Sequence, residues 1–181
     1  MEIINIIKEF EGIVGALAGV IVTLVYTEYL KRRGKVVMYV VDKELKYHTY
    51  DNVGAITKGK DGSDFYEFRI KISLDVYNGS ELPRVMRNVL LEFFVDKKCV
   101  HTVIPKDETT SRYTAGMLFH DYFSINNLMP REIQRVKLIG SVWEDDLGLI
   151  QEVNCIRMSY LDEKSKKKYC DLFSGDIKAH S

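Results

Sequence analysis

The feature that most constrains this chain is an apolar run of 19 residues, from Gly12 to Leu30, close to its N-terminus. A helix of about 20 apolar residues spans the hydrocarbon core of a bilayer. Only Thr23, Thr27 and Glu28 interrupt the run. A threonine hydroxyl can bond back to its own helix, and a glutamate in the last turn can reach the interface. The run therefore predicts a single transmembrane helix, with the rest of the chain as a domain at the membrane surface.

Two other interpretations of the run are a buried helix of a soluble protein and a cleaved signal peptide. A helix that packs on a soluble core shows an amphipathic stripe, and this run shows none. A signal peptide carries basic residues before its apolar segment and ends at small residues. Here the basic residues follow the run, and no A-x-A site stands at its end. We therefore expect the segment to stay in place.

The flanks of the run predict its orientation. After it stands a juxtamembrane cluster of four cations, Lys31, Arg32, Arg33 and Lys35, whereas the amphipathic lead-in of residues 1–11 holds one lysine among three glutamates. Cationic flanks stay in the cytoplasm. The predicted location is the cell membrane, with one pass through the lipid bilayer, the N-terminus outside and the C-terminal domain cytoplasmic.

Small residues within the run predict self-association. Gly15 and Gly19 have the G-x-x-x-G spacing that lets two helix backbones approach closely in lipid. We expect these two glycines to form a helix–helix interface between copies of the chain.

After the run, the period of the apolar residues changes from helical to two, which is typical of strands. The clearest case is 65–77, where Phe68, Ile70, Ile72 and Leu74 share the expected inward face, and charged residues such as Glu67 and Arg69 share the outward one. With turn signals between the strands, the pattern predicts an all-β domain of seven or eight antiparallel strands. It does not distinguish a β-sandwich from a small β-barrel.

The predicted organisation has three parts: residues 1–34 as lead-in and membrane helix, 35–174 as the β-domain, and 175–181 as a flexible tail. Strands are expected at 36–41 and 45–49 (one bent strand or two), 65–77, 85–95, 99–104, 117–125, 133–143, 152–161 and 167–173. The segments 51–64 and 105–115 are expected to be loops, 144–148 a turn, and no helix is expected after the first.

Several sequence patterns resemble a phosphate-binding or metal site, but each lacks a residue or element that such a site requires. Residues 54–61 nearly match a phosphate-binding loop, but Asp61 replaces the required hydroxyl and no helix is expected to follow. Cys99 and His101 are spaced to share a strand face, yet two ligands are too few for zinc. We therefore expect no catalytic residue, no metal and no cofactor, and a non-enzymatic protein. A membrane-bound hydrolase is disfavoured because no nucleophile–base pair is visible.

The amino-acid composition limits the classes of partner that we expect for this chain. The chain has 26 basic and 26 acidic residues, which gives no reason to expect a nucleic-acid polymer as partner. Its three scattered cysteines fit reduced thiols in a cytoplasmic domain. Four lysines gather at the expected last hairpin: Lys164, Lys166, Lys167 and Lys168. They are candidates for contact with anionic lipid or another anionic ligand, and the alternative is a solvated turn.

The order of membrane segment, basic linker and cytoplasmic β-domain resembles small membrane effectors of bacterial anti-phage defence. The resemblance covers the layout of the whole chain and rests on no residue motif; this chain has one predicted span where the best-known members have two. It implies a β-barrel that senses a cyclic oligonucleotide, after which the membrane segments assemble. The first hypothesis from the residues is a membrane-tethered β-domain that binds a protein or ligand at the inner leaflet, and the ligand-gated, oligomerising effector is the alternative.

Overall fold

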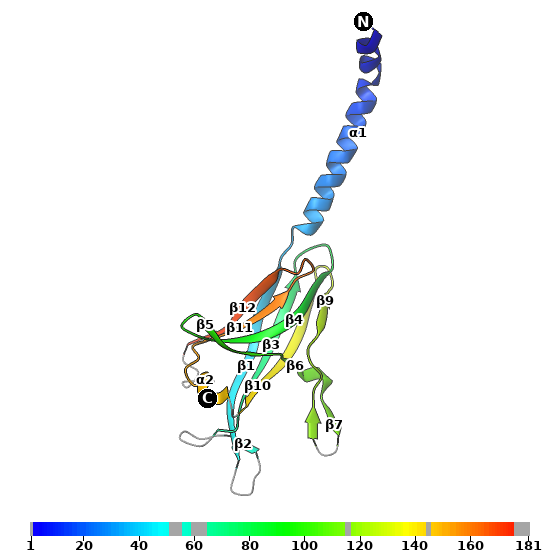
Figure 1. Cartoon of the computed structure of the whole chain (residues 1–181). Coiled ribbons are helices and arrows are strands. Elements are labelled where there is room, and N and C mark those ends of the chain that lie inside the picture. The colour runs from blue at the N-terminus through cyan, green and yellow to red at the C-terminus, as the bar shows by residue number, and fades with distance from the viewer. Residues whose placement is uncertain (1, 51–55, 59–64, 115–116, 144–145, 176–181) are drawn as a thin grey trace.

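The computed structural model describes residues 2–50, 56–58, 65–114, 117–143 and 146–175. A long helix projects from one end of a β-domain (Figure 1). Residues 54–55 and 59–61 of the near phosphate-loop match, and the expected tail beyond Gly175, lie outside the described residues.

Helix α1 runs over Glu2–Arg32 as one continuous element. Its segment Gly12–Arg32 is long and apolar enough to cross a membrane, and none of it is buried against the β-domain. The Thr23 hydroxyl donates to the Gly19 carbonyl oxygen at 2.8 Å, as expected for a threonine in an apolar helix. Glu28 forms an ion pair with Arg32 one turn later, at 2.9 Å. Both polar side chains are thus accommodated by the helix itself.

Two antiparallel sheets make up the domain. The first has the order β2 (Ile56–Lys58), β1 (Val36–Tyr50), β3 (Glu67–Asn78), β10 (Ile133–Trp143), β6 (Lys106–Asp107). The second has the order β12 (Lys167–Ser174), β11 (Cys155–Leu161), β4 (Arg84–Val95), β5 (Lys98–Val103), and β9 (Ile125–Leu128) also pairs with β4. A small separate hairpin joins β7 (Arg112–Thr114) to β8 (Met117–Phe119). Two short helical turns complete the fold, η1 (Glu108–Thr110) and α2 (Leu147–Ile150).

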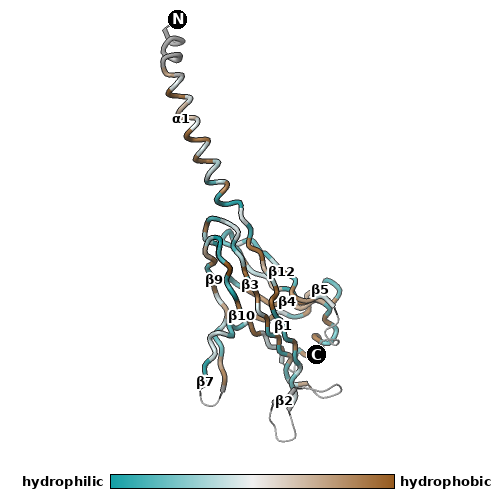
Figure 2. Tube along the Cα trace, turned by 180° about the vertical axis from the view of Figure 1, so that it is seen from behind, coloured by the Kyte–Doolittle hydropathy of each residue, from teal (hydrophilic) through white to brown (hydrophobic). Residues whose placement is uncertain are grey.

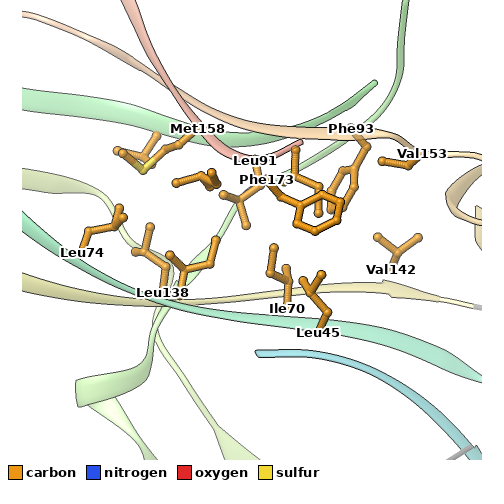
Figure 3. Close-up of a cluster of buried hydrophobic side chains, with 14 of the residues drawn as sticks. Leu45, Ile70, Leu74, Leu91, Phe93, Leu138, Val142, Val153, Met158 and Phe173 are labelled. Atoms are coloured by element: carbon orange, nitrogen blue, oxygen red, sulfur yellow. The ribbon is translucent and has the colours of Figure 1, made fainter. Parts of the chain in front are cut away.

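The core lies between the two sheets, so the fold is a β-sandwich. The predicted inward face of β3 is confirmed: Phe68, Ile70, Ile72 and Leu74 are at most 2% exposed. Figure 3 shows side chains of β1, β3 and β10 meeting those of β4, β11 and β12. Gly140 permits this approach, because an added Cβ would lie 2.8 Å from Leu91.

Strand β1 is one long strand rather than two. It pairs with β3 from Val36 to His48, and its register shifts once, between Val40 and Asp42. The bulge accounts for the bend that the sequence pattern indicated.

Several expectations about the strands were wrong. Twelve strands occur in the described residues rather than seven or eight, because segments expected to be loops contain short ones, β2 in 51–64 and β6 and β7 in 105–115. The expected strand 117–125 is not continuous: β8 covers only its first three residues, and β9 begins at its last residue and belongs to a different sheet. Helix α2 follows in the segment expected to be a turn, because Leu147 and Ile150 pack into the core.

The outward face of β3 is also less solvated than expected. Glu67 is only 1% exposed and forms an ion pair with Arg69 at 2.7 Å. In the sheet it lies between His48 on β1 and Trp143 on β10. The alternation of the sequence placed Glu67 on the correct face, but its neighbours cover it.

Candidate functional site

The end of α1 is bonded to the domain through the turn between β3 and β4. The backbone N–H of Glu81 donates to the Lys31 carbonyl oxygen at 3.1 Å, and that of Gly79 to the Lys35 carbonyl oxygen at 3.0 Å. Helix C-termini leave carbonyl groups without partners within the helix. Here the domain supplies donors to the end of the helix and to the linker that follows it.

Arg84, the first residue of β4, adds the shortest of these hydrogen bonds. Its guanidinium donates to the Arg32 carbonyl oxygen at 2.7 Å and to that of Gly34 at 3.3 Å. Its Nε donates to the Ser80 hydroxyl at 3.2 Å, and the guanidinium also forms an ion pair with Glu163. One side chain therefore joins the helix end, the turn before β4 and the β11–β12 hairpin.

A buried amide holds the turn itself in place. Asn78 is fully buried, and its Nδ2 donates to the carbonyl oxygens of Leu82 and Leu128 at 2.9 and 3.0 Å. Its Oδ1 accepts from the backbone N–H and the hydroxyl of Ser80 at 3.0 and 2.7 Å. Buried polar groups are stable when they are satisfied in this way. The turn is thus a fixed platform for the end of the helix.

Gly34 is required at the junction for steric reasons. A Cβ added to it would lie 2.1 Å from the backbone nitrogen of Ser80. The linker between helix and domain therefore runs directly against the β3–β4 turn.

The hairpin between β11 and β12 forms the other side of this junction. The Asp162 carboxylate accepts from the backbone N–H groups of Lys164 and Lys166 at 2.9 and 2.8 Å, which fixes the shape of the tip. Arg87 donates to the Ser165 hydroxyl at 2.8 Å and ties the tip to β4. The lysines of the tip therefore project from an ordered turn.

A groove of about 360 Å³ lies between the linker that follows α1, called here the helix exit, and this hairpin. Its cations are Arg84 and four lysines, called here the groove lysines: Lys35, Lys164, Lys166 and Lys168. Its other lining residues are Gly34, Val36, Val85, Tyr160, Asp162 and Glu163. Figure 2 shows the apolar helix giving way to hydrophilic residues where it meets this part of the domain. The structure thus brings one residue of the juxtamembrane cluster together with three of the predicted hairpin lysines.

The charges in the groove do not balance. Its two carboxylates are already engaged, Asp162 by backbone N–H groups and Glu163 by Arg84. Within the described residues, none of the groove lysines has an ion-pair partner. The groove therefore presents several unpaired ammonium groups to whatever enters it.

Tyr160 adds a neutral donor to the lining. Burial raises the pKa of its phenol to about 12, and the nearby Asp162 carboxylate acts in the same direction. The hydroxyl therefore keeps its proton at physiological pH and can donate a hydrogen bond to an anion.

Lys167 does not belong to the groove, although it was grouped with its neighbours in the sequence. It is 2.6 Å from the Glu92 carboxylate, which also accepts from the Ser159 hydroxyl at 2.8 Å. Successive side chains of a strand point to opposite faces, so Lys168 turns to the groove and Lys167 away from it, and Lys166, which precedes β12, also lines the groove.

The other predicted site residues lie along α1 and at its end. Arg32 is paired with Glu28, whereas Lys31 and Arg33 have no ion-pair partner in the described part of the chain. Gly15 and Gly19 have open space where a Cβ would stand, so this helix face is unoccupied in the single chain. The proposed helix–helix contact stays a prediction.

Arg84, Tyr160 and the Asn78 network were not identified from the sequence. Asn78, Gly79, Ser80 and Pro83 signalled a turn, but nothing local indicates that this turn bonds to a helix about 50 residues earlier in the chain. The contact depends on the long-range arrangement of the sheets.

The suggested pairing of Cys99 with His101 was wrong about the shared face. A bulge in the β4–β5 pairing sets Cys99 opposite Phe94 and His101 opposite Phe93, so the two side chains lie on opposite faces. No group of three or more potential metal ligands occurs within the described residues.

A second recess, of about 490 Å³, lies against the outer face of β3 and β10. Its charged side chains include two ion pairs, Arg69 with Glu67 and Lys71 with Glu108. The recess therefore lacks the excess of unpaired cations found beside the helix exit, and the groove is the stronger candidate site.

Comparison with known proteins places the chain in a family. Residues 34–172 match the YopI Ig-like domain. The chain is 32% identical over 164 residues to the SPbeta prophage-derived uncharacterized protein YopI of Bacillus subtilis, covering 90% of this chain and 92% of that protein. This match is longer than the segment from Gly34 to the C-terminus, so it extends into the helix.

Two solved structures share weaker likeness. One is an uncharacterized β-sandwich protein from Clostridium difficile 630, with 12% identity, a TM-score of 0.36 and coverage of 76% of this chain and 85% of that one. The other is the Iho670 flagellar-like filament, with 8% identity, a TM-score of 0.39 and coverage of 93% and 98%. Scores this low carry no weight for fold or function. On the family match and the curated relative, the chain belongs to the YopI Ig-like domain family.

Proposed function

We propose that this chain is a membrane-anchored, non-enzymatic interaction module. In this proposal α1 crosses the cell membrane once, and the Ig-like domain lies beside the inner leaflet, where it binds a partner. At 1.5 Å per residue, the apolar run is about 28 Å long, close to the thickness of a bilayer core. Its large apolar side chains are exposed along the helix, for example Leu17, Val22 and Val25 at 58–66%.

The observation that carries the proposal is the direct junction between this exposed helix and the domain. Leu30 ends the apolar run, and bonds from Glu81 and Arg84 to the Lys31 and Arg32 carbonyl groups follow at once. A domain bonded to the end of an apolar helix is held in a defined position at the membrane surface. The unpaired cations Lys31 and Arg33 favour placing that surface on the cytoplasmic side.

The proposal is tested with the thiols that the chain already has. Cys99 is exposed, so a membrane-impermeant maleimide reaches it only when the domain faces the reagent. We expect no labelling in intact spheroplasts, labelling after permeabilisation, and retention of the chain in membranes washed with alkaline carbonate. Labelling before permeabilisation would reverse the topology, and extraction by carbonate would refute the anchor.

The ligand-gated effector is a second candidate, because the groove shares Gly34 and Lys35 with the helix exit. A cyclic oligonucleotide bound there by its phosphates would touch the end of the membrane segment and influence its assembly. Cross-linking of α1 in native membranes, with and without cyclic dinucleotides, tests this. The candidate requires more cross-linked oligomer when the nucleotide is present, and an unchanged pattern would argue against it.

A further inference from the structure

We infer that the groove between α1 and the β11–β12 hairpin binds the phosphate of an anionic phospholipid from the leaflet that the domain faces. The inference rests on the proposed function, because the groove meets lipid only if α1 spans the membrane. The ligand of the groove would thus be an anionic phospholipid, and the domain would bind it directly beside the end of α1.

The first argument is the position of the groove relative to the end of the apolar run. Gly34 and Lys35 line it, and they follow the last apolar residue, Leu30, by four and five positions. Cations directly after a spanning run lie among the lipid headgroups. The hairpin contributes Lys164, Lys166 and Lys168 to the same groove. The groove therefore opens at the depth where phosphates lie.

The second argument is electrostatic. The groove lysines have no ion-pair partner among the described residues, and its two carboxylates are engaged by other groups. Like charges held close together repel one another, and a phosphate between them converts this repulsion into attraction. The protein keeps the arrangement through the turn at Asp162 and the ion pair of Arg84 with Glu163.

The third argument is the mixed character of the lining. Ammonium groups and the neutral Tyr160 hydroxyl suit phosphate oxygens, whereas Val36 and Val85 offer an apolar wall. A phospholipid presents the same sequence of groups, with a charged phosphate followed by glycerol and acyl carbons. Free phosphate would use the cations but leave the apolar wall unused.

Native mass spectrometry of the full-length protein in detergent tests the inference. The protein is extracted from membranes that contain equal amounts of phosphatidylglycerol and phosphatidylcholine, and the lipids that stay bound are identified. We expect one retained phosphatidylglycerol in preference to phosphatidylcholine. Each lysine near an anionic surface contributes about fivefold to binding. Replacing the three hairpin lysines (Lys164→Gln, Lys166→Gln and Lys168→Gln) should therefore reduce the preference by on the order of 100-fold.

A matched triple variant removes the same charge from surfaces outside the groove: Lys97→Gln, Lys98→Gln and Lys137→Gln. These lysines are exposed, and none of them lines the groove. We expect this variant to retain phosphatidylglycerol as the wild type does. Equal loss in both variants would mean that net charge alone attracts the lipid, and equal retention in both would place the lipid elsewhere. Either result overturns the inference.

Two further measurements accompany this experiment. The first asks whether the bound phosphate belongs to a lipid or to a soluble molecule, and the second asks whether α1 anchors the chain in the membrane. Glycerol phosphate and inorganic phosphate, added at millimolar concentration, should leave the lipid bound; displacement by either would indicate a soluble phosphate ligand instead. Carbonate washing of the same membranes tests the anchor independently. A chain that resists carbonate but shows no lipid preference refutes the groove assignment alone, whereas a chain that carbonate extracts refutes the proposed function as well.

Discussion

Replacing Arg84 by alanine should loosen the junction between α1 and the domain without unfolding the sandwich. The change removes donors to the Arg32 and Gly34 carbonyl oxygens, at 2.7 and 3.3 Å, and the ion pair with Glu163. A hydrogen bond to a charged group contributes about 1.5–3 kcal/mol when it is buried. The Arg84 side chain is 16% exposed, and its contact with the Arg32 carbonyl lies at the surface. We therefore expect a loss near the lower end of that range, about 2 kcal/mol.

Amide hydrogen exchange measures this loss at the junction itself. The Gly79 and Glu81 N–H groups donate to the Lys35 and Lys31 carbonyl oxygens, so they exchange when the junction opens. Because 1.4 kcal/mol corresponds to a factor of ten, about 2 kcal/mol should make exchange of these two amides roughly 30-fold faster. The measurement uses the full chain in detergent micelles.

Arg87→Ala is the matched control. Arg87 also lies on β4 and also bonds to the hairpin, through the Ser165 hydroxyl at 2.8 Å, but within the described residues it forms no hydrogen bond or ion pair with the helix end. Its replacement should leave the exchange of Gly79 and Glu81 unchanged. Equal acceleration in the two variants would show that the hairpin as a whole, and not the bonds from Arg84 to the carbonyls, holds the helix.

Three further predictions follow from burial and from the helix face. Ile72→Ala should lower the free energy of unfolding by about 2–5 kcal/mol in urea titrations, because it opens a cavity in the core; a loss below 1 kcal/mol would refute the packing. Arg69→Leu should cost about 3–5 kcal/mol, because it leaves the buried Glu67 carboxylate without its partner, and adding Glu67→Gln should recover most of that loss if the ion pair is the cause. Gly15→Ile with Gly19→Ile should abolish cross-linking between copies in native membranes while the chain stays inserted; cross-linking at the wild-type level would leave the helix as a tether only.

The elements that the sequence predicted well are those that local pattern alone determines. The apolar run predicted α1, and strict alternation predicted β3 with the correct inward residues. Such faces must be covered by a second layer, but they did not distinguish a second sheet from one sheet closed into a barrel. The short strands carry no such pattern. Lys106 and Asp107 form β6 only because they meet β10, which is a tertiary event.

The candidate site was predicted in parts but not as a whole. The juxtamembrane cluster and the hairpin lysines were both recognised by their charge, about 130 residues apart in the sequence. Their meeting depends on where the β11–β12 hairpin lies relative to the helix exit, and composition does not encode that. Alternation in the expected strand 167–173 already put Lys167 and Lys168 on opposite faces, but which of the two faces the helix depends on how the hairpin pairs with the rest of its sheet.

The way in which α1 leads into β1 has a mechanical consequence. The linker after Arg32 continues directly into β1, whose partners on β3 extend from Val36 to His48. A force that draws the helix away from the domain therefore acts along β1, and the hydrogen bonds to β3 resist it together, in shear, instead of opening one after another. The strand that receives a pull from the helix is thus the one bound along most of its length to the central strand of its sheet, so the domain resists force applied through α1 better than a strand peeled from its end would.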